Sequence, residues 1–285
     1  MVGSYKPEQM RDGLAGEAKR LIAQVQLTFE QELAILKANG VRDGDLIMEV
    51  GIGTGAFLSR LIDAFPNATF VGIEPNIEML DVARNTLSQY SNEPRLIHSD
   101  IQGLQGLQGL QNAIIEGPHN AGIEPVDHII ARMVFQHLQD SVGAAETLMT
   151  FLKPGGTLTI IDVDGALWGM VEPSITELVG IHFKAWASQG AHGGDRFIGH
   201  KLTRILRDAG FEHITLQVAA VDNVTSTMDN FVPLIHPENL LPQLEEGVVT
   251  LPEYKRAVKG YYDFINNPDT TILTLNFIAC GLKPL

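Results

Sequence analysis

The chain has 285 residues, of which 45% are hydrophobic and 19% charged, so it can bury a core and is neither disordered nor collagen-like. Its 20 basic and 34 acidic residues give a net charge of −14, which disfavours nucleic acid and anionic membranes as partners. The single cysteine, Cys280, cannot form an internal disulfide, and no apolar run reaches the roughly 18 residues of a membrane span. Since the first residues also lack the apolar stretch of a signal peptide, we expect an intracellular, cytoplasmic protein.

Helical and strand patterns alternate along the first part of the chain. From Glu17 to Asn39, apolar residues recur at three- and four-residue steps, which predicts an amphipathic helix that ends at Asn39-Gly40. We then expect strands at 46–50, 69–73, 95–98, 127–131 and 157–162, with helices at 57–65, 79–90 and 144–151. Strands joined through helices predict a parallel sheet with helices on both faces.

The second part of the chain is less regular. Residues 165–199 show no clear period but hold both tryptophans and several histidines, which suggests a pocket wall. A helix at 200–209 and strands at 213–221 and 271–280 follow. The proline-rich segment between the last two strands is too long for a hairpin turn, so we interpret it as a helical insertion over one end of the sheet. The Gln-Gly-Leu repeat at 102–111 is interpreted as a surface expansion without chemistry.

A glycine-rich turn follows the first expected strand. The segment reads Glu49-Val-Gly51-Ile-Gly53-Thr-Gly55, and its glycines allow backbone angles that other residues resist and let a ligand approach the main chain. With Ala56 the segment also satisfies the loose dinucleotide pattern GxGxxA, so the glycines alone do not choose the cofactor.

Two carboxylates indicate which cofactor the turn binds. Glu74 ends the next apolar strand, where a carboxylate reaches the ribose diol of either NAD or S-adenosylmethionine. Glu49 immediately precedes the glycines, where it would repel a pyrophosphate but suit the cationic amine of S-adenosylmethionine. Charge therefore favours S-adenosylmethionine.

At these residues the chain resembles the class I S-adenosylmethionine-dependent methyltransferases of the bacterial small-molecule type. Five segments carry the resemblance in order: Glu49–Gly55, Gly72–Leu80, His98–Asp100, Asp127–Arg132 and Leu152–Ile160. It covers roughly residues 20 to 220, and five segments in the right order are far more specific than any one of them.

The resemblance implies S-adenosylmethionine as cofactor and assigns its contacts. Glu49 and the first glycines would hold the methionyl portion, and Glu74 the ribose hydroxyls. Met79 could instead be a core residue, and Arg132 could instead form a salt bridge. The full set of expected cofactor-binding residues is Glu49, Gly51, Gly53, Gly55, Glu74, Pro75, Met79, Asp100, Ile101, Arg132 and Met133.

The sequence indicates the residues that bind the acceptor less clearly. His137 follows the fourth strand, where it could deprotonate an acceptor, since its reference pKa is about 6.5, or simply cap a helix and close the site. Arg196 could hold an acceptor carboxylate or phosphate, or pair with Asp195 or another acid. The expected acceptor-binding residues are Trp168, His182, Trp186, His192 and Arg196, although both tryptophans could be core. The histidines lack metal-ligand spacing, so we expect no metal.

We therefore expect a single domain with a Rossmann-like, doubly wound, mostly parallel sheet of seven strands and a helical cap. Its parts would be an N-terminal helical cap (1–40), a cofactor-binding α/β core (41–221), a helical insertion over the acceptor site (222–269) and a final strand (270–285). The expected reaction moves a methyl group to a small molecule, such as a secondary-metabolite intermediate, by in-line displacement. An NAD-dependent oxidoreductase and a non-catalytic cofactor binder are the alternatives, and a homo-oligomer is compatible with the sequence.

Overall fold

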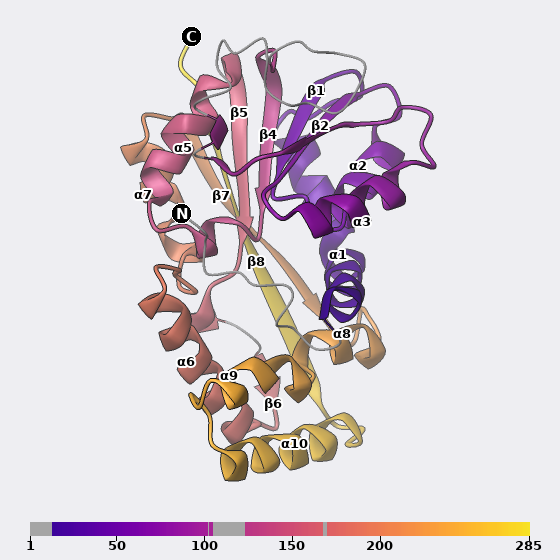
Figure 1. Cartoon of the computed structure of the whole chain (residues 1–285), viewed down its shortest axis with the longest axis vertical. Helices are drawn as coiled ribbons and strands as arrows, with labels where there is room; N and C mark the ends of the chain where they lie inside the picture. Colours follow the sequence, from indigo (N-terminus) through magenta and orange to yellow (C-terminus); the bar gives the residue numbers. More distant parts are fainter. Residues whose placement is uncertain (1–12, 102, 105–122, 168–169) are drawn as a thin grey trace.

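The structure is a computed structural model that describes residues 13–101, 103–104, 123–167 and 170–285 (Figure 1). Trp168 and residues 105–111 of the Gln-Gly-Leu repeat lie outside the described residues. Among the described residues, no helix is both long and apolar enough to cross a bilayer.

One mixed sheet organises the molecule. Its strand order is β3-β2-β1-β4-β5-β8-β6, and β7 also pairs with β8. Neighbours from β3 to β5 are parallel, whereas β8 runs antiparallel to β5, β6 and β7. The strands are β1 (Leu46–Val50), β2 (Thr69–Glu74), β3 (Arg95–His98), β4 (Val126–Arg132), β5 (Leu152–Asp162), β6 (Met170–Glu172), β7 (Glu212–Asp222) and β8 (Thr271–Leu282).

The parallel, doubly wound sheet is confirmed, but the number of strands was wrong. The sequence predicted seven strands and the structure has eight. The additional strand is β6, which pairs with the start of β8 through only three residues. Three residues are too few to show a period-2 pattern, which explains why this strand was missed.

Helices cover both faces of the sheet. α1 (Gly13–Ala38), α2 (Ala56–Ala64) and α3 (Ile77–Leu87) pack on one face, where Ile47 and Phe70 point, and α5 (Ser141–Thr150) and α7 (Leu202–Asp208) pack on the other, where Met48 and Val71 point. Neighbouring residues of a strand thus face opposite helix layers. Because the helices exclude water from both faces of the sheet, most strand residues are apolar.

A second core lies beyond the carboxyl ends of the parallel strands. β7 and β8 extend past the other strands and carry α6 (Thr176–Ala191), α8 (Met228–Ile235), α9 (Leu241–Glu245) and α10 (Leu251–Ile265), drawn in the lower part of Figure 1. The side chains of Phe231, Tyr261 and Phe264 are fully or almost fully buried there. This group of helices faces the edge of the sheet where the predicted site lies.

The stretch 165–199 was predicted to be irregular, and this was wrong. It contains β6 and the 16-residue helix α6. The buried residues of α6 are Leu178, Ile181 and Trp186, a sparse apolar face. Two glycines, Gly180 and Gly190, weaken the helical signal further, because glycine is a poor helix former.

Candidate active site

The glycine turn after β1 has the backbone that the sequence predicted. Gly51, Gly53 and Gly55 have φ values of +72°, +54° and +74°, a region that residues with a Cβ rarely adopt. A Cβ on Gly51 would also lie 2.5 Å from Cγ2 of Val134, the second residue after β4. Gly51 is therefore required both by its own conformation and by the segment that follows β4.

Glu74, the last residue of β2, holds this turn in place. Its buried carboxylate accepts hydrogen bonds from the backbone N–H of Gly53 (2.8 Å) and of Asn76 (2.9 Å). Burial raises the pKa of Glu74, and the two backbone hydrogen bonds oppose that rise. Because a carboxylate has about four acceptor positions, Glu74 can still accept the ribose hydroxyls that the resemblance assigns to it.

Glu49, in β1, is a buried acid with an unsatisfied oxygen. Only 2% of the residue is exposed, and among the described residues nothing hydrogen-bonds to its Oε2. Burial raises its pKa well above the usual value, the positive charge of Arg132 lowers it, and the carboxylates of Glu74 and Glu32 raise it again. A cationic amine would satisfy this oxygen, so the residues present fit the methionyl end of S-adenosylmethionine. The buried Oγ1 of Thr54, in the glycine turn, also has no hydrogen-bond partner among the described residues, and this was not predicted.

The other predicted cofactor residues have local structural roles. Met79 is fully buried, with its Cε 3.6 Å from where a Cβ on Gly53 would be, so it packs beneath the turn as a core residue. Asp100 accepts a hydrogen bond from the backbone N–H of Gly103, and Ile101 is buried. Pro75 accepts one from the His98 ring through its carbonyl (2.9 Å). Their contacts with the cofactor stay predictions.

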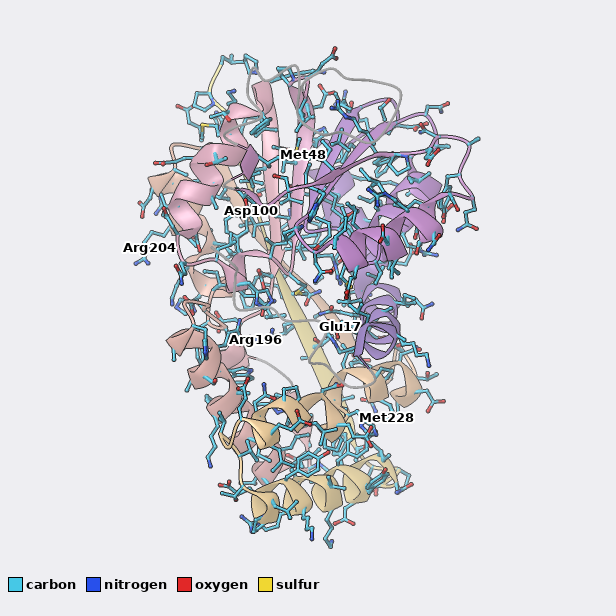
Figure 2. The ribbon with its side chains drawn as sticks, viewed as in Figure 1. Glu17, Met48, Asp100, Arg196, Arg204 and Met228 are labelled. Atoms are coloured by element: carbon cyan, nitrogen blue, oxygen red, sulfur yellow. The ribbon has the colours of Figure 1, made fainter. Side chains whose placement is uncertain are left out.

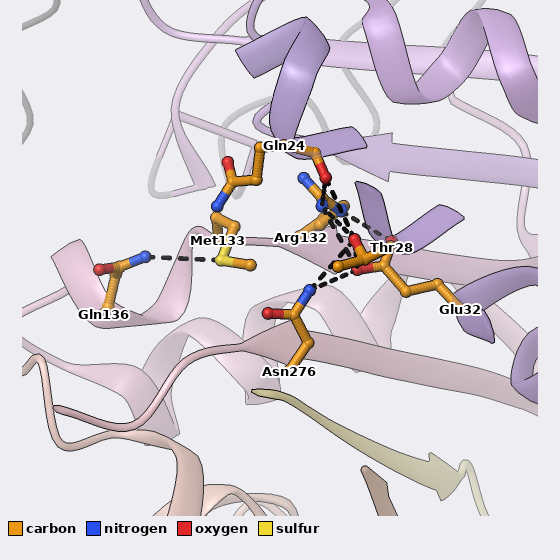
Figure 3. Close-up of polar contacts among 7 residues, drawn as sticks. All are labelled: Gln24, Thr28, Glu32, Arg132, Met133, Gln136 and Asn276. Carbon is orange, nitrogen blue, oxygen red and sulfur yellow. Dashed lines mark hydrogen bonds and ion pairs between the residues drawn. The ribbon is translucent and has the colours of Figure 1, made fainter. Parts of the chain in front are cut away.

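Arg132, at the end of β4, forms the salt bridge that was the alternative to a cofactor contact. Its Nε donates to Oε2 of Glu32 in α1 (2.9 Å), and its Nη2 donates to Thr28 Oγ1 (3.1 Å) (Figure 3). Asn276 of β8 donates to Oε1 of the same glutamate (2.6 Å). The guanidinium also lies 5.2 Å from the ring centroid of Phe57. Arg132 therefore anchors α1 to the sheet, and its expected contact with the cofactor stays a prediction.

α1 reaches the glycine turn, and this contact was not predicted from the sequence. Leu21 Cδ1 lies 3.4 Å from where a Cβ on Gly53 would be. One turn further along α1, Gln24 extends its side chain toward Met133, and its buried Oε1 has no partner among the described residues (Figure 3). Met133 itself has a φ of +58°, an uncommon backbone conformation for a side chain of this size. α1 thus borders the predicted methionyl position.

Gln136 connects the end of β4 to the predicted acceptor side. Its side-chain nitrogen donates to the Met133 sulfur (3.8 Å), and its side-chain oxygen accepts from Nη1 of Arg196. Its backbone N–H donates to Asp162, the last residue of β5 (3.0 Å). Arg196 does not pair with Asp195, which instead binds Lys201. Gln136 therefore places Arg196 one side chain away from Met133.

Two histidines on this side, His137 and His182, are neutral at pH 7. Burial, together with the charges of Arg196 and Arg20, lowers the pKa of His137 to about 3. Burial also lowers the pKa of His182 to about 4, and its Nδ1–H donates to the Leu178 carbonyl (2.8 Å). A histidine with a pKa of about 3 is a weak base, so the structure does not support the predicted general base.

Trp186 and His192 do not have the positions expected of acceptor-wall residues. Trp186 is 7% exposed and packs against Phe183 and Phe197, with ring centroids 4.9 and 5.8 Å away, so it is a core residue. His192 is exposed at the end of α6, where its Nδ1–H donates to the Ser188 carbonyl (2.8 Å). Among the described residues, no hydrogen bond or ring contact joins it to Arg196.

The predicted site residues gather at one edge of the sheet. Glu74, Arg132 and Asp162 end three strands of the parallel region, and Glu49 is the second-last residue of a fourth. Figure 2 shows Arg196 and Glu17 between this edge and the lower group of helices. In doubly wound sheets, ligands bind at the carboxyl edge of the strands.

Comparisons with known proteins match the part of the chain that contains the glycine turn. A family model described as a methyltransferase domain matches residues 48–158. Malonyl-[acyl-carrier protein] O-methyltransferase of Halalkalibacterium halodurans is 30% identical over 112 residues, which are 39% of this chain and 36% of that protein. Trans-aconitate 2-methyltransferase of Azoarcus sp. strain BH72 is 29% identical over 118 residues, which are 41% of this chain and 39% of that protein. The chain spans less than half the length of these curated relatives.

A solved structure shows the same fold. Phosphoethanolamine N-methyltransferase 2 of Haemonchus contortus, solved with phosphomonomethylethanolamine and S-adenosylhomocysteine, superposes with a TM-score of 0.52. The match has 21% identity and covers 90% of this chain and 53% of that chain. Residues 48–158 therefore match a methyltransferase domain, and the chain has the fold of a solved methyltransferase that holds S-adenosylhomocysteine.

Proposed function

We propose that the whole chain catalyses methyl transfer from S-adenosylmethionine to a small molecule bound between the carboxyl edge of the sheet and α6. The observation that carries this proposal is the unsatisfied, buried Oε2 of Glu49 beside the glycine turn. A buried carboxylate without a cation is unfavourable, and the cofactor's amine would provide that cation. The resemblance assigns Glu49 this same contact.

The residues of the chain would position and enclose the reactants. When bound, S-adenosylmethionine supplies a methyl group on a positively charged sulfur, which the acceptor attacks in line as the sulfur leaves. Glu49 and Glu74 would orient the two ends of the cofactor, while α1 and Gln24 would exclude water from its methionyl end. The insertion between β7 and β8 would close the acceptor side.

A small-molecule acceptor, such as a secondary metabolite, is proposed in preference to nucleic acid. The net charge of −14 disfavours nucleic acid. The named relatives act on a malonyl-[acyl-carrier protein] and on trans-aconitate, and the solved neighbour holds phosphomonomethylethanolamine. These relatives are methyltransferases, and none of them is an oxidoreductase, so the NAD alternative gains no support.

The test is a transfer assay with methyl-labelled S-adenosylmethionine and a cell extract fractionated at about 1 kDa. We expect S-adenosylhomocysteine to form and the label to appear in the low-mass fraction. Glu49→Gln should reduce turnover at sub-saturating cofactor, whereas Glu30→Gln, at an exposed ion pair on α1, should not. Label in the macromolecular fraction would refute the small-molecule acceptor, and no product from folded protein would support the non-catalytic binder.

A further inference from the structure

Arg196 is a cation with an unsatisfied buried nitrogen. It lies in the segment between α6 and α7, and its Nη1 donates to the side-chain oxygen of Gln136. Its Nε is buried and has no hydrogen-bond partner among the described residues. Burial lowers the pKa of Arg196 to about 10, which leaves it fully charged at pH 7. A buried N–H on a charged group without an acceptor is costly, which indicates an acceptor supplied from outside the chain.

The carboxylate of Asp162 does not form an ion pair with this cation. The negative charge of Asp162 acts on Arg196, but the described residues contain no ion pair between them within 4 Å. The two oxygens of Asp162 instead accept from the backbone N–H groups of Gln136 (3.0 Å) and Val163 (2.9 Å). Burial raises the pKa of Asp162 to about 6, so part of its charge is lost near neutrality.

A second arginine acts on this group through its charge. The positive charge of Arg20, in α1, lowers the pKa of both Arg196 and His137. Arg20 forms a two-bond ion pair with Glu17 (2.7 Å each), whose side chain is fully buried. Figure 2 shows Glu17, on α1, and Arg196 both between the sheet and the lower group of helices.

His137 adds a hydrogen-bond donor to this group. The Gln189 side-chain nitrogen donates to the Gln136 carbonyl (3.0 Å), which fixes the orientation of the amide. The same nitrogen lies 3.4 Å from His137 Nδ1, so Nδ1 is the acceptor and the neutral ring carries its proton on Nε2. The unpartnered Nε–H of Arg196 thus lies on a side chain that shares Gln136 with the neutral His137 ring, through Gln189.

We propose that Arg196, with Arg20 and His137 beside it, forms a subsite for an anionic group of the methyl acceptor, either a carboxylate or a phosphate. This inference rests on the proposed function, because Gln136 links Arg196 to Met133 and so places the subsite beside the predicted methyl donor. The planar fork of Arg196 suits either anion, since both present two oxygens at the matching spacing.

The experiment measures anion binding to the protein saturated with S-adenosylhomocysteine. Thermal shift would be recorded with malonate, with inorganic phosphate and with the neutral analogue malonamide. We expect a rise in unfolding midpoint with malonate or phosphate, and the larger of the two effects identifies the anion class; malonamide should have no effect. Arg196→Gln should weaken the anion binding by about 10- to 100-fold, and Arg204→Gln, on the exposed side of α7, should leave it unchanged.

Two controls separate the possible failures. S-adenosylhomocysteine binding is measured first by calorimetry: if the wild type does not bind it, the proposed function fails, whatever the anions do. If it binds normally but neither anion stabilises the wild type, or Arg196→Gln responds as the wild type does, the subsite alone is refuted. Arg196→Lys keeps the charge without the fork, and partial retention of binding would show that folding is intact.

Discussion

At the scale of single residues, the acidic groups expected to bind the cofactor and the cationic groups proposed to bind the acceptor lie on different elements. Glu49 and Glu74 are buried acids at the end of β1 and β2, whereas Arg196 and Arg20 are cations on the acceptor side. The separation matches a cofactor that carries a cationic amine and an acceptor that carries an anion. His137, which the sequence suggested as a base, belongs with the cations as a neutral donor.

The role of His137 has a measurable consequence. Its pKa of about 3 means that the ring stays neutral from about pH 5 upward, so its titration cannot produce an acidic limb in kcat near pH 6 to 7. His137→Gln, which keeps an N–H near the position of Nε2, should retain activity within about tenfold of wild type. His137→Phe should lose more, mainly through acceptor KM.

This prediction is checked by pH–rate profiles of wild type and both variants. If His137 were the general base, its removal in either variant would lower kcat by about 100- to 10,000-fold and remove an inflection from the wild-type profile. That outcome would overturn the donor role.

The glycine turn gives a second residue-scale prediction. Gly53→Ala meets only ordinary contacts but must keep φ near +54°, which costs about 1–2 kcal/mol. Gly51→Ala carries the same backbone cost and in addition clashes with Val134, which adds about 1–3 kcal/mol. Urea denaturation would compare the two, and a Gly51→Ala/Val134→Ala double mutant should show favourable coupling. Equal destabilisation by both single variants would contradict the steric argument.

At the scale of elements, α1 is part of the site rather than a separate cap. Its buried face carries Thr28 and Glu32, which bind Arg132 of β4 and Asn276 of β8. These groups form a fully buried polar network, and such networks fix one arrangement of the elements they join. The position of α1 therefore depends on a few polar contacts as well as on its apolar stripe.

Breaking this network should release α1. Glu32→Gln leaves Arg132 buried without its counter-charge, which should lower the free energy of unfolding by about 3–5 kcal/mol. Glu30→Gln, two residues away on the same helix, removes an exposed pair with Arg60 and should cost less than about 1 kcal/mol. Hydrogen exchange would locate the effect: faster exchange in α1 of the Glu32 variant is expected, and unchanged exchange there would refute the anchoring role.

The sequence predicted the elements better than their contacts. Strands β1, β2 and β4 were found because both faces of the sheet are buried there and their apolar runs are nearly continuous. Glu74 and the glycine turn were found because strand ends and glycines mark positions along one chain segment. The pairing of Glu32 with Arg132 joins residues 100 positions apart, and nothing local indicates the partner. A signal did exist, since Glu32 and Asn276 interrupt apolar patterns on α1 and β8 and buried polar groups need partners.

Helix α6 is an element that the sequence did not predict. Its sequence contains two glycines, one histidine and two aromatic residues in place of an amphipathic period, and it folds as a helix because α10 packs against it. Tertiary packing of this kind overrides weak local propensity. The resemblance to the methyltransferases supplied the expected cofactor residues, but the acceptor side had no such guide. Trp186 is a core residue, which the sequence left open, and His192 is exposed.

At the scale of the whole molecule, two hydrophobic cores share two long strands. β7 and β8 run from the doubly wound core into the core that Phe231 and Tyr261 help to form. The acceptor side lies between these cores, so its geometry depends on how firmly both are held. Continuous strands predict that the cores unfold together.

Phe231→Ala tests this coupling. The side chain is 1% exposed, and its removal should destabilise the protein by about 3–5 kcal/mol in one cooperative transition. Circular dichroism and tryptophan fluorescence should give coincident urea curves for wild type and variant. Two separate transitions, with the fluorescence change first, would show that the core formed with α10 unfolds by itself.

The proposed function depends on one contact, in which buried Glu49 binds the amine of the methyl donor. Because burial raises the pKa of Glu49 in the free protein, and an adjacent cation would lower it, binding should release a proton. The free energy of unfolding without ligand should rise as pH falls through the raised folded-state pKa of Glu49, since the folded protein then holds the proton more tightly than the unfolded chain. Glu49→Gln should therefore fold at least as stably as wild type at pH 7.

The direct measurement is a calorimetric titration with S-adenosylmethionine between about pH 5.5 and 7.5, in two buffers of different ionisation enthalpy. The wild type should bind with proton release and with an affinity that rises with pH. The Glu49→Gln variant should bind at least about tenfold more weakly, with no buffer-dependent heat. Equal affinity and equal proton release in the two folded proteins, or no binding by the wild type, would contradict the account.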